Sequence, residues 1–166
     1  METNVLNATA TVTELETGIQ KTVSIKANLE TCLADSFLLM IKSQVYHWNV
    51  VGPMFQPLHQ LTQEHYENLF AAIDEIAERI RALGYPAPTN MAEMVRRSVI
   101  KEDEGSTSAE QMVRNLIEDH EKVAGRFRDS AKLADLKGDL VTADLLTQRI
   151  AFHEKAVWML KAIVSD

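Results

Sequence analysis

Apolar residues recur at helical spacing along most of the chain and predict four long helices. We expect them over about residues 22–49, 57–83, 107–136 and 139–164, with a short helix over about 91–98 between the second and the third. The apolar stripe of the first helix includes Val23, Leu29, Leu33, Phe37, Met40 and Ile41. Each long helix would measure roughly 40 Å at about 1.5 Å per residue, and helices of matched length pack as an antiparallel bundle. The pattern therefore predicts an all-α fold, a four-helix bundle.

Residues with positional preferences mark the helix ends and the domain limits. Gly84 suits the C-terminal cap of the second helix, and Thr107 with Glu110 matches a capping box at the start of the third. Residues 1–12 are rich in Thr, Asn and Ala and are predicted to form a flexible arm. We therefore expect a single bundle domain over residues 13–166.

The balance of charges makes the protein acidic. Its 166 residues include 17 Lys and Arg against 24 Asp and Glu, so the formal net charge is −7. An acidic surface repels nucleic acids and anionic lipids, and it attracts cations. The one cysteine, Cys32, excludes an intrachain disulfide, and we expect it to be a small apolar core residue. The sequence shows neither a secretory signal nor a membrane-spanning run, which predicts a cytoplasmic location.

Residue types that bind metal ions gather on the second helix and just before it. His47 lies in the last turn of the first helix, and His59 lies in the first turn of the second. At about 100° per residue, four such residues share a stripe roughly 100° wide on the second helix: His59, Gln63, Asp74 and Glu78. Imidazole and carboxylate groups together suit iron, zinc or manganese.

The spacing of these residues predicts a metal site between two copies of the chain. His59 and Glu78 are roughly 28 Å apart along one helix, so they cannot bind the same ion within one chain. An antiparallel copy of the helix, related by a two-fold axis, would bring His59 of one subunit beside Asp74 and Glu78 of the other. The alternative, a site inside one bundle, needs Glu-x-x-His motifs. No histidine here has a glutamate three residues before it, which disfavours that alternative.

Three segments resemble the sequence signature of the Dps family of ferritin-like proteins. In that family the pattern HW-x3-G-x2-F-x2-LH is followed by D-x2-AER, and residues 47–59 and 74–79 match both parts in composition and spacing. Residues 138–146 are similar to the start of the family's last long helix. The likeness covers all four predicted long helices.

The resemblance implies a homododecameric hollow shell of ferritin-like four-helix bundles, with ferroxidase centres at the two-fold interfaces. The catalytic iron ligands would be His47 and His59 of one subunit with Asp74 and Glu78 of its mate. Fe²⁺ would be oxidised there, by hydrogen peroxide as the family's favoured oxidant or by oxygen, and the ferric product would be stored as mineral. Consuming Fe²⁺ and peroxide together would protect against oxidative stress. Trp48, beside a ligand, would either trap a stray oxidising equivalent or serve packing.

One position departs from the family pattern, and two others match family residues outside the ferroxidase centre. The family usually has an acidic residue four positions after the second histidine, whereas this chain has Gln63, whose neutral amide is a weak ligand. We therefore expect one strong and one weak iron position. Asp139 and Asp144 match family residues that line a three-fold pore for cation entry. The alternatives are a helix cap for Asp139 and a solvated helix face for Asp144.

The three remaining histidines are not predicted to bind metal, and other functions stay open. His65 lies off the ligand stripe and is predicted to be at the surface, while His120 and His153 are predicted to be structural and Trp158 to serve packing. Three other functions stay open: DNA-binding nucleoid protection, an inert cage whose ferroxidase centre Gln63 has disabled, and the handling of zinc or manganese. Direct DNA binding is disfavoured, because twelve copies would carry a formal charge of roughly −80.

Overall fold

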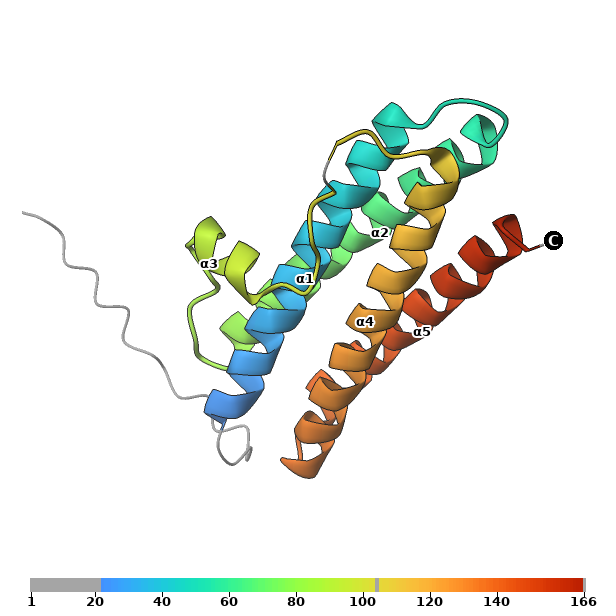
Figure 1. Ribbon diagram of the computed structural model, residues 1–166. Coiled ribbons are helices and arrows are strands. Elements are labelled where there is room, and N and C mark those ends of the chain that lie inside the picture. Colours follow the sequence, from blue (N-terminus) through green and yellow to red (C-terminus); the bar gives the residue numbers. More distant parts are fainter. Residues whose placement is uncertain (1–21, 104, 166) are drawn as a thin grey trace, which may run out of the picture.

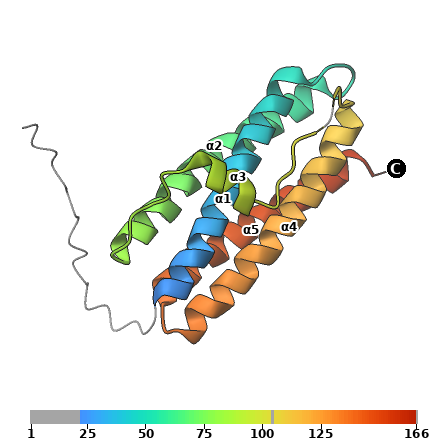
Figure 2. The ribbon, with the colours of Figure 1, turned by 60° about the vertical axis from the view of Figure 1, so that its left-hand side comes forward.

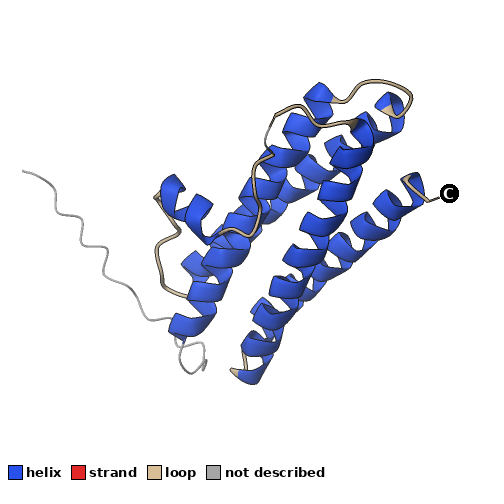
Figure 3. Ribbon diagram, in the orientation of Figure 1, coloured by secondary structure: helices blue, strands red, loops and turns tan. Residues whose placement is uncertain are grey.

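The computed structural model describes residues 22–103 and 105–165, and these residues contain five α-helices. They are α1 (Thr22–Asn49), α2 (Phe55–Ala82), α3 (Met91–Arg97), α4 (Ala109–Leu136) and α5 (Leu140–Ile163). The four long helices form one bundle, in which α1 packs against α2 and α4 against α5, and this part of the chain contains no strand (Figures 1 and 3). The short α3 lies beside α1 on the outside of the bundle (Figure 2). The predicted all-α bundle with a short helix before α4 is confirmed, whereas the predicted arm lies outside the described residues.

The helix ends follow the predictions in part. Gly84, which follows α2, has a φ of 88°, a left-handed conformation that glycine adopts without strain. Helix α2 begins at Phe55, two residues before the predicted start. The predicted capping box at α4 is wrong, because Ser108 rather than Thr107 is the cap. The Ser108 Oγ accepts a hydrogen bond from the backbone N–H of Gln111 at 3.2 Å, so α4 begins one residue later than that box requires.

The core runs along the centre of the bundle, between the four long helices. Its largest fully buried side chains include Ile25, Leu29, Leu58, Leu69, Ile76, Leu116, Phe127, Leu146 and Leu160. Burial of each such side chain contributes roughly 1.5 to 3 kcal/mol, which makes this core the main source of stability. Cys32 is fully buried, as expected, and burial raises the pKa of its thiol to about 12. Two members of the predicted stripe are exposed instead, Val23 by 66% in the first turn of α1 and Ile41 to a lesser extent.

A buried carboxylate holds the connection between α3 and α4 against α1. Asp35 on α1 accepts hydrogen bonds from the hydroxyl of Ser98 at 2.9 Å and from the backbone N–H of Val99 at 2.8 Å. The guanidinium of Arg126 on α4 forms an ion pair with it at 3.1 Å. Loss of any partner would leave a buried charge incompletely compensated, so this contact fixes the connection in place. Among the described residues, no helix combines the length and the apolar character needed to cross a membrane.

Candidate metal centre

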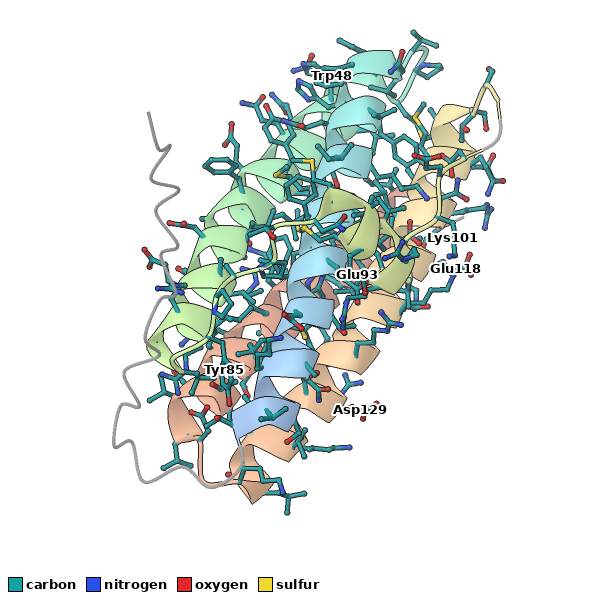
Figure 4. All side chains as sticks on the ribbon, turned by 90° about the vertical axis from the view of Figure 1, so that its left-hand side faces the viewer. Trp48, Tyr85, Glu93, Lys101, Glu118 and Asp129 are labelled. Atoms are coloured by element: carbon teal, nitrogen blue, oxygen red, sulfur yellow. The ribbon has the colours of Figure 1, made fainter. Side chains whose placement is uncertain are left out.

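The end of α1 and the start of α2 bring His47 and His59 together. The chain reverses direction between the two helices at Gly52, whose φ of 88° favours glycine. The backbone N–H of Phe55 then donates to the carbonyl of Gly52 at 2.9 Å, which starts α2. Figure 4 shows Trp48 at this end of the bundle and Tyr85 at the opposite end. The two predicted imidazole ligands therefore share one end of the bundle.

Each imidazole is oriented by the backbone of the other residue. The Nδ1 of His47 lies 2.8 Å from the carbonyl oxygen of His59, and the Nδ1 of His59 lies 2.8 Å from the carbonyl oxygen of His47. Because a carbonyl oxygen can only accept, both Nδ1 atoms carry the proton and donate it. In its neutral form each ring then has its lone pair on Nε2, and neither Nε2 is hydrogen-bonded within the described chain. This is the arrangement that prepares a histidine to bind a metal ion.

The two rings are stacked, which determines how many ions they can bind. Their centroids are 3.7 Å apart and their planes differ by 16°, while Phe55 stacks on the far side of His59 at 5.0 Å. The edge of Tyr66 contacts His47, with 5.3 Å between centroids. A nitrogen lone pair lies in the plane of its ring, so two nearly parallel planes cannot direct both lone pairs at one ion. The geometry therefore fits one ion for each imidazole, as in a two-metal site.

The two predicted carboxylate ligands lie elsewhere in the chain. Asp74 and Glu78 are exposed on the second half of α2, and neither forms a hydrogen bond or an ion pair with a described residue. Within residues 22–103 and 105–165, no three His, Cys, Asp or Glu side chains gather into a group that could bind a metal ion. A single chain therefore presents the imidazoles and the carboxylates separately. This is the separation that the spacing along α2 predicted.

Gln63, the position that departs from the family pattern, is exposed one turn after His59. Its Nε2 donates a hydrogen bond of 2.8 Å to Oε1 of Glu67, one turn further along α2. Neither Glu67 nor Tyr66 was predicted as a site residue. Both could have been found from helical spacing, because at about 100° per residue they lie on or beside the face of α2 that carries His59.

The two predicted pore residues differ in their surroundings. Asp139 is buried at the start of α5, where its Oδ1 accepts from the backbone N–H of Thr142 at 3.0 Å and from the Nη2 of Arg79 at 2.6 Å. Within the chain its carboxylate therefore serves as a helix cap and ion-pair partner, which fits the alternative, and its predicted pore role stays untested. Asp144 is exposed and accepts a hydrogen bond from Gln148 at 2.8 Å. A pore role for Asp144 stays a prediction.

The remaining histidines form a buried cluster, and the prediction that His65 lies at the surface is wrong. His65, His120 and His153 are all buried between α2, α4 and α5. The Nδ1 atoms of His120 and His153 are 2.9 Å apart, and the rings of His65 and His120 meet at 4.9 Å. Burial lowers the pKa of His65 to about 4 and, together with Arg149, that of His153 to about 3. The positions of His120 and His153 fit a structural role, whereas Trp158 is 66% exposed and does not pack within the chain as predicted.

Known proteins share this fold and much of this sequence. The Ferritin-like domain family matches residues 26–166. An uncharacterised low temperature-induced protein of Nostoc sp. is 45% identical over 134 residues, which cover 80% of this chain and 75% of that protein. The DNA protection during starvation protein of Brevibacillus brevis is 34% identical and aligns with 90% of this chain and 99% of its own.

The structural similarity extends to a solved structure. A crystal structure of a Dps protein from Vibrio cholerae O1, described as a member of a broad superfamily of ferritin-like diiron-carboxylate proteins, has a TM-score of 0.82 and 30% identity over 87% of this chain and 91% of that one. The bundle, with its short helix between α2 and α4, therefore defines a ferritin-like protein. Within that class, the chain belongs to the Dps family.

Proposed function

We propose that this protein is a cytoplasmic ferroxidase that oxidises Fe²⁺ at centres shared by two subunits and stores the ferric product in a homododecameric shell. The observation that carries the proposal is the His47–His59 pair, whose backbone hydrogen bonds leave both Nε2 lone pairs available to metal ions. Iron is the ion we favour because the solved Vibrio cholerae relative is described as a ferritin-like diiron-carboxylate protein.

The exposed face of α2 supports a second copy of the chain as the source of the carboxylates. Phe70 is 69% exposed and lies about 20° from His59 around the helix, amid the predicted ligands. We take this exposed aromatic side chain, together with the carboxylates that have no partner in the described chain, as part of a surface that a second copy covers. If two α2 helices pair antiparallel so that His59 meets Asp74 and Glu78, the two-fold axis lies near Glu67. One such contact completes two equivalent centres.

The two-ion geometry suits the chemistry of peroxide. Two Fe²⁺ ions at one centre each give one electron to a single hydrogen peroxide; its O–O bond breaks, and two protons complete two water molecules. Because both electrons are transferred at one centre, no hydroxyl radical is released. The carboxylates of Asp74 and Glu78 would stabilise the harder Fe³⁺ product more than Fe²⁺, which favours oxidation. This coupling is how we propose that the protein protects against oxidative stress.

Stopped-flow absorbance tests the proposed activity. The anaerobic Fe²⁺–protein mixture is combined with peroxide or with oxygen, beside a His47→Ala/His59→Ala variant, an Asp74→Ala variant and a Glu110→Gln control on the exposed face of α4. We expect a ferric signal that forms faster than in buffer and is lost in the first two variants only. The faster oxidant identifies the substrate. A wild-type rate equal to that of buffer would establish the inert cage instead, with Gln63 marking a disabled centre.

Direct DNA binding is a separate function, suggested by the name of the Brevibacillus brevis relative. The net charge of −7 per chain argues against it here, since binding to duplex DNA depends mainly on Lys and Arg contacts to phosphates. A gel-shift experiment at low salt decides between the two. We expect free duplex at every protein concentration, and retarded duplex would show that DNA is bound directly.

A further inference from the structure

The hydrogen bond between Gln63 and Glu67 determines which atom of Gln63 is left for a metal ion. A carboxylate only accepts hydrogen bonds, so the amide must turn its nitrogen toward Glu67, as the 2.8 Å contact between Nε2 and Oε1 shows. The carbonyl oxygen of Gln63 then has no hydrogen bond within the described chain. His59 and Gln63 are one helical turn apart and therefore neighbours on the surface of α2. The amide oxygen is therefore the atom of Gln63 that remains available to an ion bound at His59.

We propose that Glu67 is a positioning residue that makes the amide oxygen of Gln63 a ligand of the metal ion at His59. The inference rests on the proposed function and deepens it. Donation of the amide N–H to a carboxylate polarises the amide and increases the electron density on its oxygen, which makes that oxygen a better ligand for a hard cation. The negative charge that the family usually places at position 63 is thereby moved one turn along the helix. The second iron position is retained rather than lost.

The face of α2 distinguishes Glu67 from its neighbour Glu64. Measured from His59 at about 100° per residue, Gln63 and Glu67 lie about 40° and 80° around the helix, inside the ligand stripe, whereas Glu64 lies about 140° away. Both glutamates are exposed in the single chain, and each carries the same charge. In the proposed pairing of two subunits Glu67 lies near the two-fold axis. The partner then excludes water from its contact with Gln63, and exclusion of water strengthens that hydrogen bond.

Anaerobic calorimetric titration with Fe²⁺ tests this role without any turnover. We expect the wild-type protein to bind two ions per centre, and Glu67→Gln to weaken the second by about 10- to 100-fold while leaving the first unchanged. Gln63→Ala should have the same effect on the second ion. Glu64→Gln is the matched control, with the same loss of charge on the same helix, and should bind as the wild type does. Thermal unfolding of each variant shows whether the fold is intact.

A rescue variant separates positioning from a general loss of charge. Gln63→Asp combined with Glu67→Gln places a carboxylate directly at position 63, so the second ion should return to wild-type affinity or better. Two ions bound equally well by wild type and Glu67→Gln would overturn this inference and leave the ferroxidase intact. Equal weakening of both ions, or no rescue by Gln63→Asp, would also overturn it. A wild-type protein that binds no Fe²⁺ would overturn the proposed function as well.

Discussion

The side chains of His47 and His59 are each fixed by the main chain of the other residue, through two hydrogen bonds of 2.8 Å from Nδ1 to a carbonyl oxygen. These bonds close the junction of α1 and α2 and determine the tautomer of both rings. Because the acceptors are backbone atoms, replacing one side chain leaves the acceptor of the other in place. The pair is therefore two independently oriented candidate ligands, with their rings stacked at 3.7 Å.

Replacing one of these histidines should remove one iron position and leave the other. We expect His47→Ala and His59→Ala each to bind one Fe²⁺ per centre in place of two, since each ring directs its lone pair at a separate ion. With only one ion present, peroxide would receive a single electron, and spin-trapped hydroxyl radical should rise above the wild-type level. Anaerobic titration and spin trapping measure the two effects. A single replacement that abolished binding of both ions would contradict the independence of the two rings.

The ion pair between Arg79 and Asp139 should contribute strongly to stability. The Asp139 side chain is fully buried and that of Arg79 is 14% exposed, so the contact between the end of α2 and the start of α5 is shielded from water. Asp139→Asn keeps a side-chain oxygen that can cap α5 but leaves the Arg79 charge without its partner. We expect a loss of about 3 to 5 kcal/mol in the free energy of unfolding. Urea unfolding at fixed subunit concentration measures it. Asp144→Asn is the control and should change the free energy of unfolding by less than about 0.5 kcal/mol. A similarly small loss for Asp139→Asn would contradict the predicted contribution of the ion pair.

The buried histidine cluster should make the bundle sensitive to mild acid. Burial lowers the pKa of His65 to about 4 and of His153 to about 3. The pKa of His120 falls well below its ordinary value, mainly because of burial and also because of the neighbouring His153, His65 and Arg149. Below a pH of about 6.5 the unfolded chain binds protons at these residues while the folded chain does not. The free energy of unfolding is therefore undiminished by these histidines above pH 6.5, and it decreases as the pH falls toward 4. Unfolding would take up as many as three protons, so the free energy of unfolding would change by up to about 4 kcal/mol per pH unit.

Urea unfolding between pH 7.5 and 5 tests this acid sensitivity. The cluster is faced by one charged group, Arg149, which is itself nine-tenths buried, and by the uncharged rings of Phe152 and Phe127. His65→Leu should reduce the slope of stability against pH by about one proton. Leu69→Ala, one turn further along α2, should lower stability equally at every pH and leave the slope unchanged. A wild-type stability that stays constant from pH 7.5 to 5 would show that the cluster is protonated in the folded state.

Asp144 should affect the entry of iron rather than its oxidation. It is exposed near the start of α5, and a ring of such carboxylates around a three-fold axis would raise the local Fe²⁺ concentration. We expect Asp144→Asn to slow mineral formation from external Fe²⁺ by about tenfold at low salt, while a single turnover of bound Fe²⁺ keeps its wild-type rate. Light scattering and stopped-flow absorbance measure the two rates. Unchanged mineral formation in this variant, with Glu110→Gln as the control, would remove Asp144 from the path of entry.

The helical spacing of the sequence predicted the bundle and the separation of His59 from Asp74 and Glu78 along α2. The pairing of His47 with His59 was implied only by the family resemblance. The helical spacing also held the signal that His65 is buried, because His65 lies about 240° around α2 from His59, on the face that carries the buried Leu69. A position off the ligand stripe does not by itself distinguish a surface residue from a buried one, which is why the prediction for His65 was wrong.

Other features depend on contacts that spacing along one helix does not determine. Arg79 and Asp139 lie on different elements and are sixty residues apart in the sequence, so their pairing follows from the packing of α2 against α5. The exposure of Trp158 likewise depends on which surfaces the neighbouring helices leave uncovered. Ser108 could have been recognised as a cap, since serine and threonine have similar preferences there, but sequence alone did not separate it from Thr107.

The central claim is that each centre takes its imidazoles and its carboxylates from different subunits, and subunit mixing tests it most directly. One chain carries His47→Ala/His59→Ala, the other carries Asp74→Ala/Glu78→Ala, and the two are co-assembled in equal amounts. Half of the two-fold contacts are then mixed, and each mixed contact restores one of its two centres. We predict that either chain alone oxidises Fe²⁺ no faster than buffer and that the mixture recovers about a quarter of the wild-type rate. A mixture as inactive as its parents would contradict the claim, because centres contained within one chain cannot be restored by mixing.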